Sequence, residues 1–156
     1  YRFDSTDTVT PAWSNTFEPT VSVSSGITVT DSRTPGGSTK KYASVIIRLG
    51  QYGGAIDLSQ YNNISLLMTE GGTCTASTLG TDFKIGISSS DTASSVNDFD
   101  MIPYQGGSVW SGSQIFDGDL TKLSAAKRRG IRSIYLQAAV NATGPCTLNF
   151  GNISFI

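Results

Sequence analysis

The chain contains no histidine and only two glutamates, Glu18 and Glu70. The absence of histidine excludes Ser-His-Asp and Cys-His catalysis and any zinc site with a histidine ligand. A pair of aspartates could serve glycoside hydrolysis, but most of the candidates lie beside Gly or Asn, where a carboxylate more simply caps a turn. The candidates are Asp98, Asp100, Asp117 and Asp119. The sequence therefore predicts that the protein is not an enzyme.

Charge is also scarce, because only 15% of the residues are charged and the net charge is −1. Such a chain has no general field to attract nucleic acid or an anionic membrane. No apolar run approaches the roughly 20 residues of a membrane helix. We therefore expect neither nucleic acid nor membrane as a partner.

Glycine is frequent, with 17 residues, and Ser and Thr crowd the loops. This composition is typical of extracellular β-modules whose surfaces carry neutral hydrogen-bonding groups. It predicts a secreted protein and favours neutral polymers as ligands. Because the chain starts at Tyr1 and not at Met, we expect it to be processed or excised.

Cys74 and Cys146 are the only cysteines, and both lie among turn residues. We predict a disulfide between them, which would contribute about 4 kcal/mol in the chain-entropy model for so long a loop. The alternative is two unrelated thiols in a cytosolic protein.

Short runs of alternating apolar residues recur between Gly, Pro, Ser and Asn. A chain of 156 residues can bury roughly 70% of its unfolded surface, so a single domain over residues 1–156 needs no metal to fold. Many short strands with turns between them predict a sandwich or barrel. The predicted strands are 21–24, 27–30, 42–49, 63–69, 82–88, 109–116, 131–140 and 147–156.

Only Leu120 to Arg129 has a helical pattern, with Leu120, Leu123 and Ala126 on one side and Gly130 to end it. The predicted fold class is therefore all-β: a β-sandwich (jelly roll) of two antiparallel sheets with one short helix.

Successive side chains of a strand point to opposite faces, so each strand can be divided into a core face and an outer face. Four core stripes result: Val45, Ile47 and Leu49; Ile64, Leu66 and Met68; Phe83, Ile85 and Ile87; Ile134, Leu136 and Ala138.

On the outer faces of the same strands lie Arg48, Lys84, Tyr135 and Gln137, with Tyr42 and Ser44. If the strands share a sheet, these residues form one surface of hydrogen-bond donors around an aromatic platform. The alternative is a solvated sheet face with scattered charges, since one sequence does not give the strand order.

Loop aromatics offer further candidates for contact with a sugar. Tyr104 and Trp110 flank a Gly-rich loop, and Tyr52 stands beside Gly53 and Gly54, where small neighbours let a ligand approach. Core packing is the alternative for Trp110. Trp13 more simply packs beneath the N-terminal segment.

Several motifs follow one another in an order that resembles the β-jelly-roll carbohydrate-binding modules of secreted polysaccharide-degrading enzymes. The motifs are Phe3-Asp4 with Trp13, the Gly-rich loop and Asp-Leu-Ser-x-Tyr turn of residues 53–65, Trp110 leading to Phe116 and Asp119-Leu120, the strand 131–137, and Gly151-Asn152-Ile153. The resemblance covers almost the whole chain and implies the sandwich fold and a polysaccharide ligand.

Such modules often hold a structural calcium near their first and last strands. Asp4 and Asn152 are the weak candidates here, because Asn152 stands where an acid is expected. Asp117 and Asp119 offer another carboxylate pair, yet calcium needs six or more oxygens and no full loop is visible. No other cofactor is implied.

The leading hypothesis is non-catalytic binding of polysaccharide, which targets an attached enzyme or cell-surface protein to glycan. Stacking on sugars is assigned to Tyr135, Tyr52, Tyr104 or Trp110, and hydrogen bonding to Gln137, Arg48 and Lys84. The alternative is a structural subunit of an extracellular filament or virion that pairs exposed sheet edges. A binding module is expected to be a monomer, and a subunit to self-assemble.

Overall fold

The computed structural model describes residues 8–11, 20–23, 27–31, 39–50, 54–75, 83–105 and 113–156. Within these ranges it gives the backbone alone for residues 9–11, 20–23, 28–31, 39–43, 70–75, 104–105, 113–114, 139–146 and 148.

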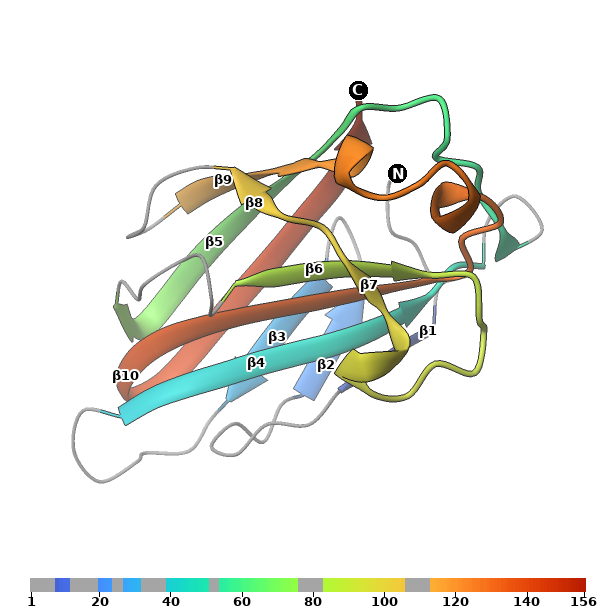
Figure 1. Cartoon of the computed structure of the whole chain (residues 1–156). Helices are drawn as coiled ribbons and strands as arrows, with labels where there is room; N and C mark the ends of the chain where they lie inside the picture. Colours follow the sequence, from blue (N-terminus) through green and yellow to red (C-terminus); the bar gives the residue numbers. More distant parts are fainter. Residues whose placement is uncertain are drawn as a thin grey trace.

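The strands form two antiparallel sheets packed face to face (Figure 1). Sheet A contains, in order, β1 (Thr8–Pro11), β4 (Thr39–Arg48), the first half of β10 (Ser133–Phe155), β6 (Lys84–Ser88) and β7 (Asp100–Met101). Sheet B contains β2 (Thr20–Val23), β3 (Ile27–Asp31), the second half of β10, β5 (Asn63–Thr75), β9 (Ser113–Asp119) and β8 (Tyr104–Gln105). The all-β sandwich is confirmed.

Strand β10 belongs to both sheets. Its pairing with β4 ends at the pair Ala142 and Thr39, and its pairing with β3 begins at Cys146 and Asp31. Residues 143–145 between them, predicted as a turn between two strands, form the corner where one continuous strand passes from sheet A to sheet B (Figure 1). The two predicted strands 131–140 and 147–156 are therefore one element.

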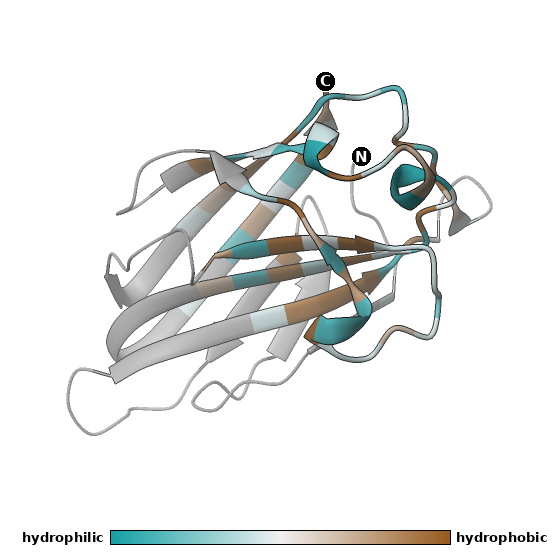
Figure 2. Cartoon of the chain, in the orientation of Figure 1, coloured by the Kyte–Doolittle hydropathy of each residue, from teal (hydrophilic) through white to brown (hydrophobic). Residues whose placement is uncertain are grey.

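The core lies between the sheets and is built from the four predicted stripes, all of whose members are buried. Apolar residues alternate with polar ones along the first half of β10, whereas Val45, Ile46 and Ile47 form an unbroken apolar stretch on β4 (Figure 2). Phe83, next to β6, and Phe116 of β9 join the two layers with ring centroids 4.7 Å apart. Burial of such large apolar side chains is the main stabilising term of the fold.

The predicted short helix is two separate 3₁₀ turns, η3 (Leu120–Lys122) and η4 (Ala126–Arg128). Only Leu120 is fully buried, Leu123 is half-buried, and Ala126 is exposed, contrary to its predicted inward position. A stripe this short does not hold a longer helix against the core. Gly130 follows at φ +60°, a conformation that favours glycine and ends the segment as predicted.

Within the described ranges, no helix is both long and apolar enough to cross a membrane.

Candidate functional site

The outer face of sheet A brings the predicted hydrogen-bonding residues together. Strand β10 lies between β4 and β6, so the expectation that these strands share a sheet is confirmed. Their register gives three rows across the strands: Arg48, Ser133 and Ser88; Ile46, Tyr135 and Gly86; Ser44, Gln137 and Lys84.

Residues 89–103, here called the cover segment, pass over the first two rows (Figure 1). The segment contains the 3₁₀ turn η2 (Val96–Asp98) and strand β7. Ala93 and Phe99 pack with Ile46 and Tyr135 in a small apolar cluster outside the main core. The outer face of sheet A is therefore partly an interior surface.

Tyr135 is consequently buried, with 3% of its surface exposed, and not an open platform for a sugar. Its ring centroid lies 5.5 Å from that of Phe99. Strand alternation placed Tyr135 on the correct face, but it could not reveal a distant segment lying on that face. Desolvation raises the pKa of the Tyr135 hydroxyl, opposed by a hydrogen bond with Ser44.

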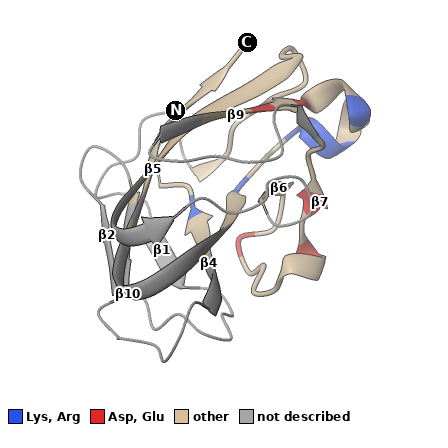
Figure 3. Cartoon of the chain, turned by 90° about the vertical axis from the view of Figure 1, so that its left-hand side faces the viewer, with Lys and Arg blue, Asp and Glu red and all other residues tan. Residues whose placement is uncertain are grey.

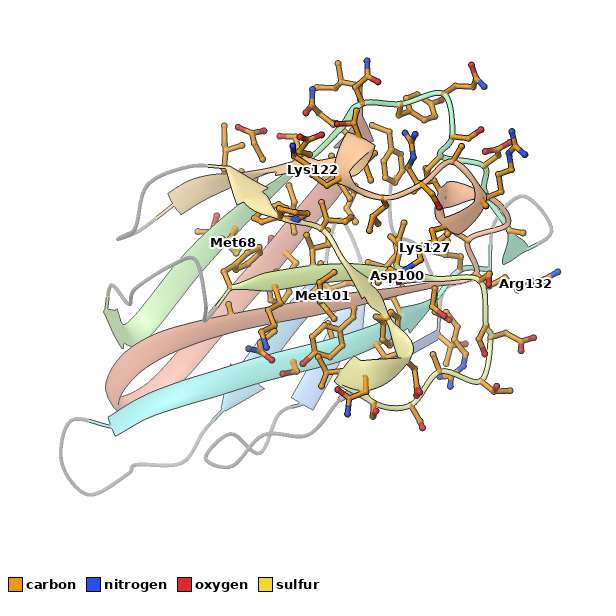
Figure 4. All side chains as sticks on the ribbon, viewed as in Figure 1. Met68, Asp100, Met101, Lys122, Lys127 and Arg132 are labelled. Carbon is orange, nitrogen blue, oxygen red and sulfur yellow. The ribbon has the colours of Figure 1, made fainter. Side chains whose placement is uncertain are left out.

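Gly86 allows the cover segment to lie this close. A Cβ atom added to Gly86 would come within 2.8 Å of the Phe99 Cβ and 2.9 Å of the Met101 Cε. Figure 4 shows Met101 on this side of the molecule. The close approach of the segment therefore requires a glycine in the middle row.

Arg48 holds the cover segment from below. Its Nε donates to the carbonyl oxygen of Asp91, and its Nη2 donates to that of Ala93 at 3.1 Å. Ser133 Oγ donates to the Ser90 carbonyl at 2.7 Å. Arg48 was predicted to contact sugar hydroxyls, but its two guanidinium N–H donors bind backbone carbonyls of the cover segment and position it.

An ion pair fastens the other end of the segment. The Lys127 Nζ atom of η4 lies 2.7 Å from the Asp100 Oδ1 atom of β7, and Figure 4 shows the two side chains facing each other. Basic residues gather around η3 and η4, while acidic residues lie on the cover segment and at the end of β9 (Figure 3). Opposite charges thus meet where the segment crosses toward η4.

Two of the aspartates considered for catalysis, Asp98 and Asp119, accept hydrogen bonds within turns. Asp98 accepts hydrogen bonds from the backbone N–H groups of Ser94 and Ser95, and these bonds lower its pKa. Asp119 accepts from the Thr121 hydroxyl and backbone N–H, and the hydroxyl bond is the main cause of its lowered pKa. Both carboxylates therefore stabilise turns, as their neighbours suggested.

The third row, Ser44, Gln137 and Lys84, lies beyond the cover segment and is here called the polar row. Gln137 and Lys84 are partly exposed, and Ser44, at the β4 end of the row, is buried. Gln137 Oε1 accepts a hydrogen bond from the Tyr135 hydroxyl at 2.7 Å and one from Ser44 Oγ at 3.5 Å. These bonds fix the orientation of the Gln137 amide, and Lys84 is the register partner of Gln137 on β6.

Of the remaining predicted contacts, only the backbone of Tyr104 is described. Tyr104 belongs to β8 at the edge of sheet B, where only its backbone is described. Tyr52 and Trp110 lie outside the described residues, as do Asp4 and Trp13. Their predicted roles remain predictions.

The weak calcium candidates are described only in part, because Asp4 lies outside the described residues. Asn152 is exposed on β10, Asp117 is exposed on β9, and Asp119 is bonded to Thr121. Among the described residues, no three His, Cys, Asp or Glu side chains come together as a metal site.

Cys74 and Cys146 lie on neighbouring strands of sheet B. Cys146 pairs with Gly72, and Cys74 pairs with Ala142, on either side of a register shift. Their side chains are outside the description, so the disulfide remains a prediction.

Tyr61 is a surface aromatic residue to which sequence reasoning assigned no binding role. It is 38% exposed and follows the Asp57-Leu58-Ser59 turn. The signal was present in the sequence, because an aromatic residue among Gln60, Asn62 and Asn63 belongs to a polar turn.

No protein-family model matches the chain, and no curated protein matches its sequence. Solved structures do match over most of its length. A mutant of xylanase 10C from Cellvibrio japonicus in complex with xylopentaose has a TM-score of 0.50 at 8% identity, over 99% of this chain and 28% of that chain. This likeness shows the sandwich fold alone.

Carbohydrate-binding modules are also among the similar structures. One, from a study of promiscuous specificity in modules of the β-sandwich superfamily, has a TM-score of 0.48 at 10% identity, over 97% of this chain and 57% of that chain. A family 30 module of a Clostridium thermocellum cellulosomal cellulase has a TM-score of 0.43 at 15% identity, over 96% of each chain.

Proposed function

We propose that the chain binds polysaccharide without cleaving it, through the polar row of sheet A. The observation that carries the proposal is the register of β4, β10 and β6, which aligns Ser44, Gln137 and Lys84 across three adjacent strands. The cover segment lies over the two neighbouring rows and leaves Gln137 and Lys84 of the polar row partly exposed.

The geometry suits a sugar chain that runs across the strands. Neighbouring strands are about 4.8 Å apart, so three of them give a row roughly 10 Å long. The Lys84 ammonium group donates hydrogen bonds, and the Gln137 amide, held by Tyr135 and Ser44, has a defined orientation. Preorganised polar groups of this kind reduce the entropy that binding costs.

Polar contacts of about 1 kcal/mol each do not give micromolar affinity, which needs about −8 kcal/mol. A ring that covers about 60–100 Å² of sugar adds up to about 2 kcal/mol. With Tyr135 buried, we assign this contribution to Tyr42, whose backbone pairs with Ala139 two residues beyond the Gln137–Ser44 pair, and to the predicted loop aromatics Tyr52 and Trp110.

Binding without catalysis assigns the protein a targeting role, in which it holds an attached enzyme or cell-surface protein close to glycan outside the cell. The low charge and the hydroxyl-rich loops support a secreted location. The ammonium group of Lys84 is compatible with both neutral and uronate-bearing polymers.

Affinity electrophoresis through soluble neutral and acidic polysaccharides tests the proposal. We expect at least one polysaccharide to retard the native chain, and Lys84→Ala and Gln137→Ala to lose most of that retardation. Lys122→Ala is the matched control, since Lys122 has an exposed side chain on η3 and lies off the row. Loss of retardation in the control alone would contradict the placement.

Absence of retardation across the whole panel would favour the filament or virion subunit. Size-exclusion chromatography then decides, because a subunit forms polymers and a module stays monomeric. The edges β7 and β8 are only two residues long, which leaves little backbone for pairing with a neighbour at those edges.

A further inference from the structure

Tyr61 presents the one exposed aromatic ring among the side chains that the structure describes. The other described rings, Phe83, Phe99, Phe116, Tyr135 and Phe150, are buried, and Phe155 is half-buried. Tyr61 stands just before β5, beside the C-terminal end of β10. The end of β10 beside it is the end farthest from the corner at residues 143–145 (Figure 1).

The turn that carries Tyr61 is held firmly on several sides. The Tyr61 N–H donates to the Leu58 carbonyl at 3.1 Å, and Arg128 Nη1 donates to the Tyr61 carbonyl at 2.6 Å. Leu58 is buried in the main core, and the Asn62 N–H donates to the Ile156 carbonyl at 2.8 Å. The backbone that positions the ring is thus fixed before any ligand arrives.

The ring itself rests on Phe155, with centroids 5.8 Å apart and planes inclined by 44°. This contact supports one side of the Tyr61 ring while much of the residue stays open to solvent. A supported, partly exposed ring offers an apolar surface at a low cost in side-chain entropy.

Exposed polar residues flank Tyr61 in the sequence. Gln60 and Asn62 are exposed next to it, and Asn63 is exposed at the start of β5. The Asp57 carboxylate accepts hydrogen bonds from Ser59, which lower its pKa, and the charges of Arg129 and Arg128 act in the same direction. Amides, a carboxylate and guanidinium groups together provide the donors and acceptors that sugar hydroxyls require.

We propose that Tyr61 is a second glycan contact, on which one pyranose unit of a polysaccharide stacks while the amides of its turn bind hydroxyls. The inference rests on the proposed function and extends it. Two contacts on different parts of one module bind a long polymer far better than a short oligosaccharide, because the second contact becomes intramolecular.

The test measures retardation by the polysaccharide that retards the native chain, for three variants. Tyr61→Ala is expected to weaken binding to the polymer roughly tenfold, equivalent to about 1.4 kcal/mol. Tyr61→Phe keeps the ring and should bind like the native chain. Leu67→Ala is the matched control, because Leu67 is an apolar residue, 47% exposed, on the outer face of sheet B.

Urea midpoints measured on each variant show whether the fold is retained, and Tyr61→Phe preserves the test if Tyr61→Ala unfolds. A tenfold loss in Tyr61→Ala with an unaffected Lys84→Ala supports Tyr61 and overturns the polar row. Equal retardation of Tyr61→Ala and the native chain overturns the Tyr61 contact alone. A native chain that no polysaccharide retards overturns both proposals.

Discussion

Replacement of Tyr135 by alanine is expected to destabilise the fold, because this ring is packed between sheet A and the cover segment. A tyrosine that is 3% exposed removes about 150 Å² or more from water, which corresponds to roughly 4 kcal/mol as an upper figure. The lost ring pair with Phe99, at 5.5 Å, adds about 1 kcal/mol. Partial collapse of the cavity reduces the total, so we expect about 3–4 kcal/mol.

Tyr135→Phe separates packing from hydrogen bonding. It keeps the ring and removes only the hydroxyl that donates to Gln137 Oε1, so the expected cost is about 1 kcal/mol. Both variants are compared with the native chain by urea denaturation, monitored by circular dichroism. The free energies of unfolding are taken from midpoints and slopes.

An unchanged urea midpoint for Tyr135→Ala would refute this reasoning. It would mean that the ring is exposed in solution and that the cover segment does not rest on it. In that case Tyr135 would again be available as the stacking platform that strand alternation suggested.

Three further predictions concern the cover segment. Gly86→Ala should lower the free energy of unfolding by about 1–3 kcal/mol, because its Cβ would meet Phe99 and Met101 below 3 Å; a urea midpoint equal to the native one would contradict the close packing. Arg48→Met removes the hydrogen bonds to the Asp91 and Ala93 carbonyls, so amide hydrogen exchange should become faster in residues 89–103 and stay unchanged in the core around the rings of Phe83 and Phe116. An equal increase in exchange in both regions would refute a local role for Arg48. Burial raises the pKa of Tyr135 above its ordinary value of 10.0. The stability that the neutral, buried hydroxyl contributes is therefore fully present below pH 10 and is lost as the pH rises through the raised pKa of the folded state. The native chain should therefore lose more stability than Tyr135→Phe above pH 10, and parallel pH profiles would contradict the burial.

The main strands were predictable because apolar residues recur at every second position of each, even where an outer position is also apolar, as at Ile46 and Leu67. Ile64, Leu66 and Met68 follow the period of two that a half-buried strand imposes, and all are buried. The edge strands β7 and β8 were not predicted, since two residues carry no period. The corner of β10 was read as a turn because Gly144 and Pro145 are typical turn residues.

The candidate site was predicted only in part, for a different reason. Alternation within a strand gives the face of Gln137 and Lys84, and their shared sheet follows from pairing that no local pattern encodes. The cover segment lies more than thirty residues before Tyr135 in sequence, and its contact depends on Gly86, Phe99 and Arg48 acting together. Such nonlocal contacts decide whether an outward residue is open to a ligand.

The central claim is that glycan binds on the polar row of sheet A. Amide chemical-shift mapping of the ¹⁵N-labelled chain, titrated with cello-, manno-, xylo- and uronate oligosaccharides, tests it most directly. The account predicts that one of these ligands shifts the amide signals of Ser44, Lys84 and Gln137 in a saturable manner. Saturable shifts confined to other strands, or no shift with any of the oligosaccharides, would contradict it.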